Sequence, residues 1–305
     1  MPFRFGFQTM AQDLAGIVDD ARNAEAAGFD IFQVGDHLGA GVAPLVALSA
    51  VAAATERISL GTLVLNNDLR HPVVLAHELA TLDLACGGRL EVGLGAGHSF
   101  TEYDAAGIPF DPPAVRKQRL GEAIEILRAL LDGAPTTFRG RHYTLEHATI
   151  PRPAQAHVPI LVGVNGRSAL AHAAGHADIV GLTMLGRTLP DGQHHELRWE
   201  ASRLDETVAW TRAAAASASA DRTVRLHALV QAAVVTDDRT GVAADIATRE
   251  HMTLDDVLAT PFLCLGTHQE MSDHLRECRR RWGIEYYTVR AIEDFEPVID
   301  RLRSA

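Results

Sequence analysis

Lysine is almost absent from this 305-residue chain, and basic residues as a class are outnumbered by acidic ones. The sequence contains 28 lysines and arginines against 39 aspartates and glutamates, which gives a formal net charge of −11 with histidine neutral. Lys117 is the single lysine. A chain with this negative balance is repelled by nucleic acid and by anionic lipid. We therefore expect no nucleic-acid partner and no membrane partner.

Cysteines and long apolar runs are also scarce. Cys86, Cys264 and Cys278 are widely separated and form no C-x-x-C pair, which excludes a disulfide framework and a zinc ribbon. The first residues contain no apolar segment typical of a secretory signal. The longest mostly apolar run, 42–55, is too short to span a bilayer. These absences predict a cytoplasmic protein.

Short apolar segments alternate with segments of helical periodicity along most of the chain. The expected strands are 3–8, 31–34, 58–64, 89–93, 159–163, 178–182, 224–235 and 286–289. The expected helices are 14–27, 43–54, 72–85, 114–131, 167–174, 204–216, 271–282 and 294–302. This alternation predicts parallel strands joined by right-handed crossovers. About eight such units favour an α/β fold of the closed (β/α)8 type, a TIM barrel, over an open sheet.

Two stretches interrupt the alternation. Residues 186–199 are polar and include His194 and His195, and residues 236–261 carry several acidic residues with weak helical character. No segment is rich enough in glycine, serine or proline to mark a domain boundary. We therefore expect one domain, 1–305, with these two stretches as insertions at barrel loops.

Polar residues and glycines follow five of the expected strands directly. These strand-end segments are 35–37, 65–68, 93–98, 164–168 and 183–184. In a barrel of this type, the loops after the strands share one face, and that face holds the active site. Such residues also gather in ordinary loops, but their repetition at the same place in five units favours a ligand site.

The glycines Gly93, Gly95 and Gly97 differ from a dinucleotide-binding fingerprint. Their spacing is G-x-G-x-G rather than G-x-G-x-x-G, and they follow the fourth strand rather than the first. Glycines here let the backbone approach a flat ring, or expose its N–H groups. The alternative is a tight turn of the barrel.

The segment Asn165-Gly166-Arg167-Ser168 opens a helix directly after a strand. Free N–H groups and the helix dipole favour a phosphate at such a turn, and Arg167 and Ser168 add donors. Capping of the helix by Asn165 or Ser168 explains the same residues equally well.

His37, beside Asp36, is the candidate acid or base, because a neutral imidazole exchanges protons near pH 7. A purely structural hydrogen bond is the alternative. Metal catalysis is disfavoured: His172 and His176 are four residues apart, but no carboxylate is recognisable as a third ligand. The first strand also lacks the H-x-H pair of metal-dependent barrel hydrolases, and the chain contains no G-x-S-x-G elbow and no P-loop.

Several motifs together resemble the bacterial-luciferase-like superfamily of flavin and deazaflavin oxidoreductases. They are Ile58–Val64 with Arg70-His71-Pro72, Ala80–Asp83, Gly87–Gly97, Glu102-Tyr103, Gly107–Phe110, Gly140–Tyr143, Pro151-x-Pro153 and Pro159–Gly163. Three further segments, Gly97-His98, Ile108–Pro113 and Trp282–Arg290, are similar to the branch that uses the deazaflavin coenzyme F420. The resemblance covers nearly the whole chain.

This resemblance implies a barrel that forms a homodimer and binds F420, with FMN as the alternative cofactor. It implies that His37 acts at the reactive ring carbon, that a non-proline cis peptide lies near Leu63-Val64, and that 165–168 bind phosphate. His98 occupies the position where some sugar-phosphate-oxidising members have a glutamate. The cofactor-binding residues implied are Asp36, His37, Leu63, Val64, Asn66, Gly95, Ala96, Gly97, His98, Tyr103, Asn165, Gly166, Arg167, Ser168 and Met184.

The first functional hypothesis is an F420-dependent oxidoreductase that moves a hydride to or from a small organic substrate. The second is an FMN-dependent monooxygenase of the same superfamily, which uses reduced flavin and oxygen. A third is a coenzyme-binding barrel without turnover, but such a binder has no need of a proton donor like His37 beside the ring.

Overall fold

The computed structural model describes residues 2–39, 41–188, 195–219, 221 and 223–304. The barrel strands are β1 (Arg4–Gln8), β2 (Ile31–Val34), β3 (Ser59–Thr62) with its continuation β4 (Leu65–Asn66), β5 (Leu90–Gly95), β8 (Ile160–Val164), β9 (Ile179–Leu182), β12 (Arg225–Leu229) and β15 (Ile284–Val289). They pair in parallel in the order β3-β2-β1-β15-β12-β9-β8-β5-β4, and β3 also pairs with β5. The sheet is thus closed, and the predicted (β/α)8 barrel is confirmed.

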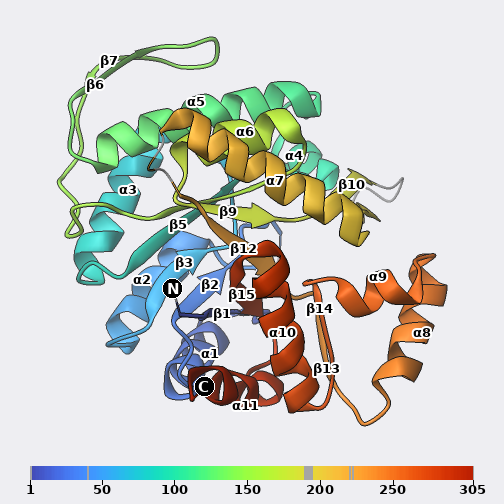
Figure 1. Ribbon diagram of the computed structural model, residues 1–305. Coiled ribbons are helices and arrows are strands. Elements are labelled where there is room, and N and C mark those ends of the chain that lie inside the picture. The colour runs from blue at the N-terminus through green and yellow to red at the C-terminus, as the bar shows by residue number, and fades with distance from the viewer. Residues whose placement is uncertain (1, 40, 189–194, 220, 222, 305) are drawn as a thin grey trace.

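Helices cover the outside of this barrel (Figure 1). They are α1 (Leu14–Ala26), α2 (Pro44–Ala54), α3 (Pro72–Ala85), α5 (Pro113–Leu131), α6 (Arg167–His176), α7 (Ala201–Ala218), α10 (His268–Trp282) and α11 (Ile292–Arg303). Prolines begin α2, α3 and α5, where the missing N–H costs no helical hydrogen bond. Thr267 and Glu270 form a capping box at the start of α10, and Gly283 ends that helix with a φ of 69°.

Other elements lie outside the barrel. They are the turn η1 (Asn67–Leu69), α4 (Phe100–Ala106), the hairpin β6 (Thr136–Arg139) and β7 (Thr144–Ala148), the hairpin β10 (Leu185–Thr188) and β11 (His195–Leu197), and β13 (Ala232–Val235), α8 (Arg239–Glu250), α9 (Leu254–Ala259) and β14 (Leu263–Gly266). The β6–β7 hairpin and the α8–α9 segment project away from the barrel (Figure 1). The sequence predicted an insertion at 186–199, of which 189–194 lie outside the described residues.

The prediction of one continuous strand over 224–235 is wrong. Val230 N–H still donates to Thr288 O of β15, but Gln231 N–H donates to Phe262 O, beside β14. The chain therefore changes its pairing partner between two adjacent residues, and β13 forms a separate two-stranded sheet with β14. The predicted insertion, 236–261, lies between these two strands as α8 and α9.

The barrel interior contains a buried polar network besides its aliphatic core. Tyr286 donates to Glu91 at 2.8 Å and accepts a hydrogen bond from Gln33, and Thr288 links Gln33 to His227. Burial, followed by the nearby positive charge of Arg4, lowers the pKa of His227 to about 3. His227 is therefore a neutral hydrogen-bonding residue of the core.

The end of β3 passes unusually close to β5. The Thr62 hydroxyl donates to Gly93 O at 2.9 Å and accepts from Gly93 N–H at 2.9 Å. A Cβ atom on Gly93 would lie only 1.9 Å from Thr62 O, which is a backbone atom with no freedom to rotate away. Closure of the barrel at this point therefore requires glycine.

We expect Gly93→Ala to lower the free energy of unfolding by about 3 kcal/mol, because the added methyl group forces two paired strands apart. Equilibrium denaturation in urea measures this loss. Gly175→Ala is the matched control, because its Cβ would lie 3.8 Å from Ala218 Cβ, an ordinary contact. In a helix this control should raise stability by up to about 1 kcal/mol. A Gly93→Ala protein as stable as the unmodified chain would contradict the close approach.

Candidate active site

The predicted strand-end segments lie at one end of the barrel, because all barrel strands are parallel. The peptide bond between Leu63 and Val64, at the end of β3, is cis, which confirms the expectation from the family resemblance. Gln8 Nε2, at the end of β1, donates to the carbonyl oxygen of Leu63 at 2.7 Å. Arg290 in turn donates to Gln8 Oε1 at 2.9 Å. A chain of hydrogen bonds thus holds the Leu63 carbonyl in place.

Glycines surround the Val64 side chain and form a cradle. A Cβ on Gly95 would lie 2.7 Å from Val64 Cγ2, and a Cβ on Gly163 would lie 3.7 Å from Val64 Cγ1. Gly97 has a φ of 72°, and a Cβ there would lie 2.1 Å from the Tyr103 hydroxyl. The backbone of β5 therefore comes close to its neighbours where side chains would block it.

Asp36 is buried at the end of β2 and is occupied by contacts within the protein. Its carboxylate pairs with both terminal nitrogens of Arg70, at 2.6 and 3.2 Å, and accepts from the backbone N–H of Asn66 at 2.9 Å. This arrangement ties the end of β2 to β4. Asp36 thus positions the strand ends on either side of the site.

Tyr103 of α4 also holds backbone segments of the site together rather than facing a ligand. Its fully buried hydroxyl donates to Asn66 Oδ1 at 3.0 Å and lies 2.9 Å from Asp68 Oδ2. Burial first, and then the charge of Asp68, raise the pKa of Tyr103 to about 12. The phenol therefore stays protonated and holds α4 against the turn after β4. Ala96 and Gly97, which follow β5, both accept hydrogen bonds from Arg116 through their carbonyl oxygens.

His37 pairs with Glu102 of α4 at the carboxyl end of the barrel. His37 Nδ1 lies 2.8 Å from Glu102 Oε1, and Leu38 N–H donates to Glu102 Oε2 at 3.1 Å. Burial acts to raise the pKa of Glu102, but these hydrogen bonds outweigh it and hold the pKa below its ordinary value. An ionised carboxylate only accepts, so the His37 proton resides on Nδ1 and Nε2 is left to exchange a proton.

A second imidazole lies beside this pair. The ring of His98 meets the ring of His37 edge to face, with 5.7 Å between their centroids. The His37 side chain is 63% exposed, so a ligand at this end of the barrel can reach it. The structure thus brings together two of the predicted residues and adds Glu102, whose carboxylate was not singled out from the sequence.

The turn before α6 has the form of an anion site. Gly166 is the N-cap residue with a φ of 90°, and no side chain caps the helix there, so neither Asn165 nor Ser168 is the cap. The Asn165 side chain instead accepts a hydrogen bond from the Thr183 hydroxyl, after β9. The first N–H groups of α6 are therefore available for a bound anion.

Two cations lie at this turn. Lys117 Nζ donates to Asn165 O at 2.7 Å, and it would lie 3.6 Å from a Cβ on Gly166. Burial, and then the nearby Arg116, lower the pKa of Lys117. The Arg167 guanidinium stacks over the Trp210 ring at 5.3 Å. The only lysine of the chain thus supports the predicted phosphate turn. In the sequence, the rarity of lysine is the one feature that could have pointed to Lys117.

Met184 follows β9 with a buried side chain and a φ of 47°. Its carbonyl oxygen accepts a hydrogen bond from Arg198 N–H at 3.0 Å, which joins the β10–β11 hairpin to the strand end. This backbone conformation is uncommon for a residue with a side chain, and it turns the chain sharply at the edge of the site.

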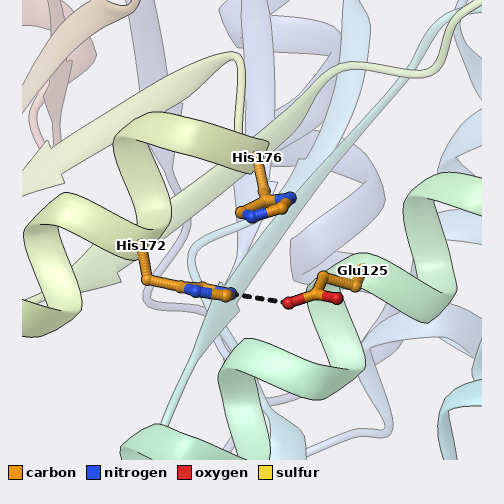
Figure 2. A group of neighbouring side chains, drawn as sticks. All are labelled: Glu125, His172 and His176. Atoms are coloured by element: carbon orange, nitrogen blue, oxygen red, sulfur yellow. Dashed lines mark ion pairs between the residues drawn. The ribbon is translucent and has the colours of Figure 1, made fainter. Parts of the chain in front are cut away.

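The sequence-based conclusion that no carboxylate joins His172 and His176 is wrong. Glu125, from α5, lies beside both histidines on the outside of the barrel (Figure 2). Two surface cavities are also present. One is lined by residues of α8, α9 and α10, and the other lies between α1 and α11 beside Phe7 of β1 and Arg290, which follows β15. None of these features touches the His37–Glu102 pair.

Comparison with known proteins assigns the family. Residues 1–286 match the luciferase-like monooxygenase family, and the chain therefore belongs to it. The F420-dependent glucose-6-phosphate dehydrogenase of Nakamurella multipartita is 37% identical over 188 residues, which are 58% of this chain and 55% of that protein. The chain thus spans about half the length of the curated relatives that it matches.

Solved structures of this fold include enzymes with different cofactors. The F420-dependent tetrahydromethanopterin reductase from Methanopyrus kandleri superposes with a TM-score of 0.75 and 19% identity, over 98% of this chain and 97% of that one. A monooxygenase from Streptomyces bottropensis gives 0.74 and 22%, over 97% and 96%. At such identities the likeness establishes the fold alone. Among the described helices, none is long and apolar enough to cross a bilayer.

We expect Glu102→Ala to change the tautomer of His37. With the carboxylate present, Nδ1 carries the proton of the neutral ring. Without it, the ring should shift toward the ordinary form protonated on Nε2. Nitrogen NMR of histidine-labelled protein near pH 8 distinguishes the two forms. The control is Glu78→Ala, which removes an exposed carboxylate beside His77 on α3. The same His37 tautomer in all three proteins would contradict the pairing.

Proposed function

We propose that this protein is an F420-dependent oxidoreductase that transfers a hydride between the deazaflavin and a small organic substrate. The observation that carries this proposal is the His37–Glu102 pair, which lies at the end of the barrel that also holds the glycine cradle and the uncapped turn of α6. The F420-dependent glucose-6-phosphate dehydrogenases among its relatives support the choice of F420.

The residues fit such a coenzyme at both of its ends. The partly exposed Val64 side chain lies against Gly95 and Gly163, and it offers an apolar surface on which a planar ring can lie. The free N–H groups of α6, with Arg167 and Lys117 nearby, suit a phosphate group. Asp36 and Tyr103 hold these backbone segments in place rather than presenting polar atoms of their own.

His37 supplies or removes the proton that accompanies hydride transfer. Glu102 keeps the Nδ1 proton in place and stabilises the imidazolium form when Nε2 has taken a proton. When bound, the deazaflavin supplies a ring carbon that accepts or donates two electrons as a hydride. Holding the substrate against that ring is the remaining task of the strand-end loops, and such positioning contributes up to roughly 7–11 kcal/mol to lowering a barrier.

The second candidate is an FMN-dependent monooxygenase. Membership of the luciferase-like monooxygenase family favours it. The two candidates differ in the ring that the cradle holds, so coenzyme binding separates them directly.

We expect the purified protein to bind F420 in a saturable fluorescence titration and to bind FMN far more weakly. His37→Ala should still bind F420 saturably, because the cradle and the phosphate turn remain intact. Its turnover should fall about a hundredfold or more, as expected for loss of a general acid or base. Turnover is followed by coenzyme absorbance in a screen of small alcohols and sugar phosphates. Tight FMN binding without F420 binding would overturn the choice of coenzyme. Unchanged turnover in His37→Ala would remove the assigned role.

We also propose that the protein forms a homodimer through α2 and α3. The only polar residue in α2 is Ser49, and a helix that is apolar on all sides is normally covered. Val46 of α2 and Val74 of α3 are nevertheless 67% and 55% exposed, and the two helices pack against each other. Exposed aliphatic side chains on adjacent helices suit an interface between two copies.

The double variant Val46→Glu with Val74→Glu should convert the dimer into a monomer, because burying two carboxylates in an apolar interface is strongly unfavourable. Size-exclusion chromatography with light scattering measures the mass. Val235→Glu is the control, since Val235 is 44% exposed on β13, away from α2 and α3. A monomeric unmodified chain, or a double variant that stays dimeric, would reject this interface.

A further inference from the structure

Glu125, His172 and His176 form a cluster between two helices on the outside of the barrel, which we call the α5–α6 cluster (Figure 2). His172 and His176 are one turn apart on α6, so both rings lie on the same face of that helix. Glu125 extends from the facing helix α5 toward them. The proposed hydride-transfer mechanism uses none of the three residues.

The donor atoms of the cluster are already close together. His172 Nε2 lies 3.6 Å from Glu125 Oε1, and the centroids of the His172 and His176 rings lie 4.6 Å apart. One donor atom from each residue falls within 4.8 Å of the others. Donors around a tetrahedral zinc ion are roughly 3.4 Å apart, which follows from metal–nitrogen distances near 2.1 Å. Small side-chain rotations therefore suffice to close the cluster around an ion.

The packing of α5 against α6 holds one ligand in place. His172 Nε2 lies 3.1 Å from Gly121 O of α5. A Cβ on Gly121 would lie 3.0 Å from that nitrogen, so only glycine leaves the ring this much room. When an ion binds at Nε2, the proton of the neutral ring moves to Nδ1, and the metal bond replaces the hydrogen bond to Gly121.

We propose that the α5–α6 cluster binds a divalent transition metal ion of the zinc class. Two imidazoles and one carboxylate are ligands that Zn²⁺, Co²⁺ and Ni²⁺ accept, whereas Mg²⁺ and Ca²⁺ prefer oxygen ligands throughout. Three protein ligands leave a fourth position for water. The proposal does not depend on the coenzyme or on the proposed reaction.

An ion at this place would link the two helices that carry the predicted phosphate turn. The turn precedes α6 directly, and Lys117 of α5 holds its Asn165 carbonyl. The ion would lie nearer the other end of α6, where it would prevent the two helices from separating. Its effect is therefore a gain in stability that depends on metal concentration.

Isothermal titration calorimetry of chelator-treated protein without a histidine tag, at pH 7.5, tests the proposal. Zinc chloride should bind at one site per chain, and magnesium chloride should give no binding heat. Zinc should also raise the melting temperature, and Co²⁺ should give the visible absorption of a four-coordinate site. His176→Ala and Glu125→Gln should each weaken zinc binding more than about tenfold, since even residues behind the ligands contribute that much.

The control variant is His77→Ala, which removes an exposed histidine on α3. It should bind zinc as the unmodified chain does. Circular dichroism confirms that all three variants are folded. Two results would overturn the proposal: the absence of saturable zinc binding, or zinc binding that survives both His176→Ala and Glu125→Gln. Either result would leave the cluster as a histidine–carboxylate ion pair only.

Discussion

The close passage of β3 against β5 is the constraint on which the rest of the candidate site depends. The Thr62 hydroxyl exchanges two hydrogen bonds with the Gly93 backbone at a place that leaves no room for a Cβ atom on Gly93. A Cβ atom on Gly95 would likewise collide with the Val64 side chain. These glycines reduce local stability in a strand, where a side chain would normally pack. In return, the backbone of β5 can pack directly against Thr62 and Val64 beside the cis peptide, at the end of the barrel where the proposed coenzyme site lies.

Residues that are neighbours in the sequence have different roles beside this cradle. Asp36 and His37 are adjacent in the chain, yet Asp36 faces Arg70 inside the protein while His37 faces Glu102 and the exterior. Adjacent side chains point in different directions once a strand ends, and the buried carboxylate is stabilised by a bidentate guanidinium. The side chain that pairs with His37 is therefore a carboxylate distant in the chain.

The barrel could be predicted because its signals are local. Pro72 and the apolar residues that follow it give the bounds of α3. The strand ends follow from the glycines and polar residues after each apolar run. The Leu63–Val64 bond follows from resemblance to the family. Contacts between distant segments produce no comparable local pattern in the sequence. Glu102 lies on a short helix without periodicity, and Glu125 meets His172 only through the packing of α5 on α6.

Helix α5 shows how a chain poor in basic residues distributes them. Arg116, Lys117 and Arg119 occupy its first turns, where the helix dipole disfavours positive charge. Each is directed to a different loop at the carboxyl end of the barrel. Arg116 donates to carbonyl oxygens after β5, Lys117 donates to the turn before α6, and Arg119 pairs with Asp68 after β4.

Because the dipole opposes this placement, the contacts with these loops must offset its cost. The three cations replace hydrogen bonds that the loops would otherwise make with water, and they leave the N–H groups of α6 free for an anion. A substitution in α5 that kept the helix but removed one cation would therefore loosen one loop without unfolding the barrel. The same helix continues to Glu125, so one element supports both the proposed coenzyme site and the proposed metal site.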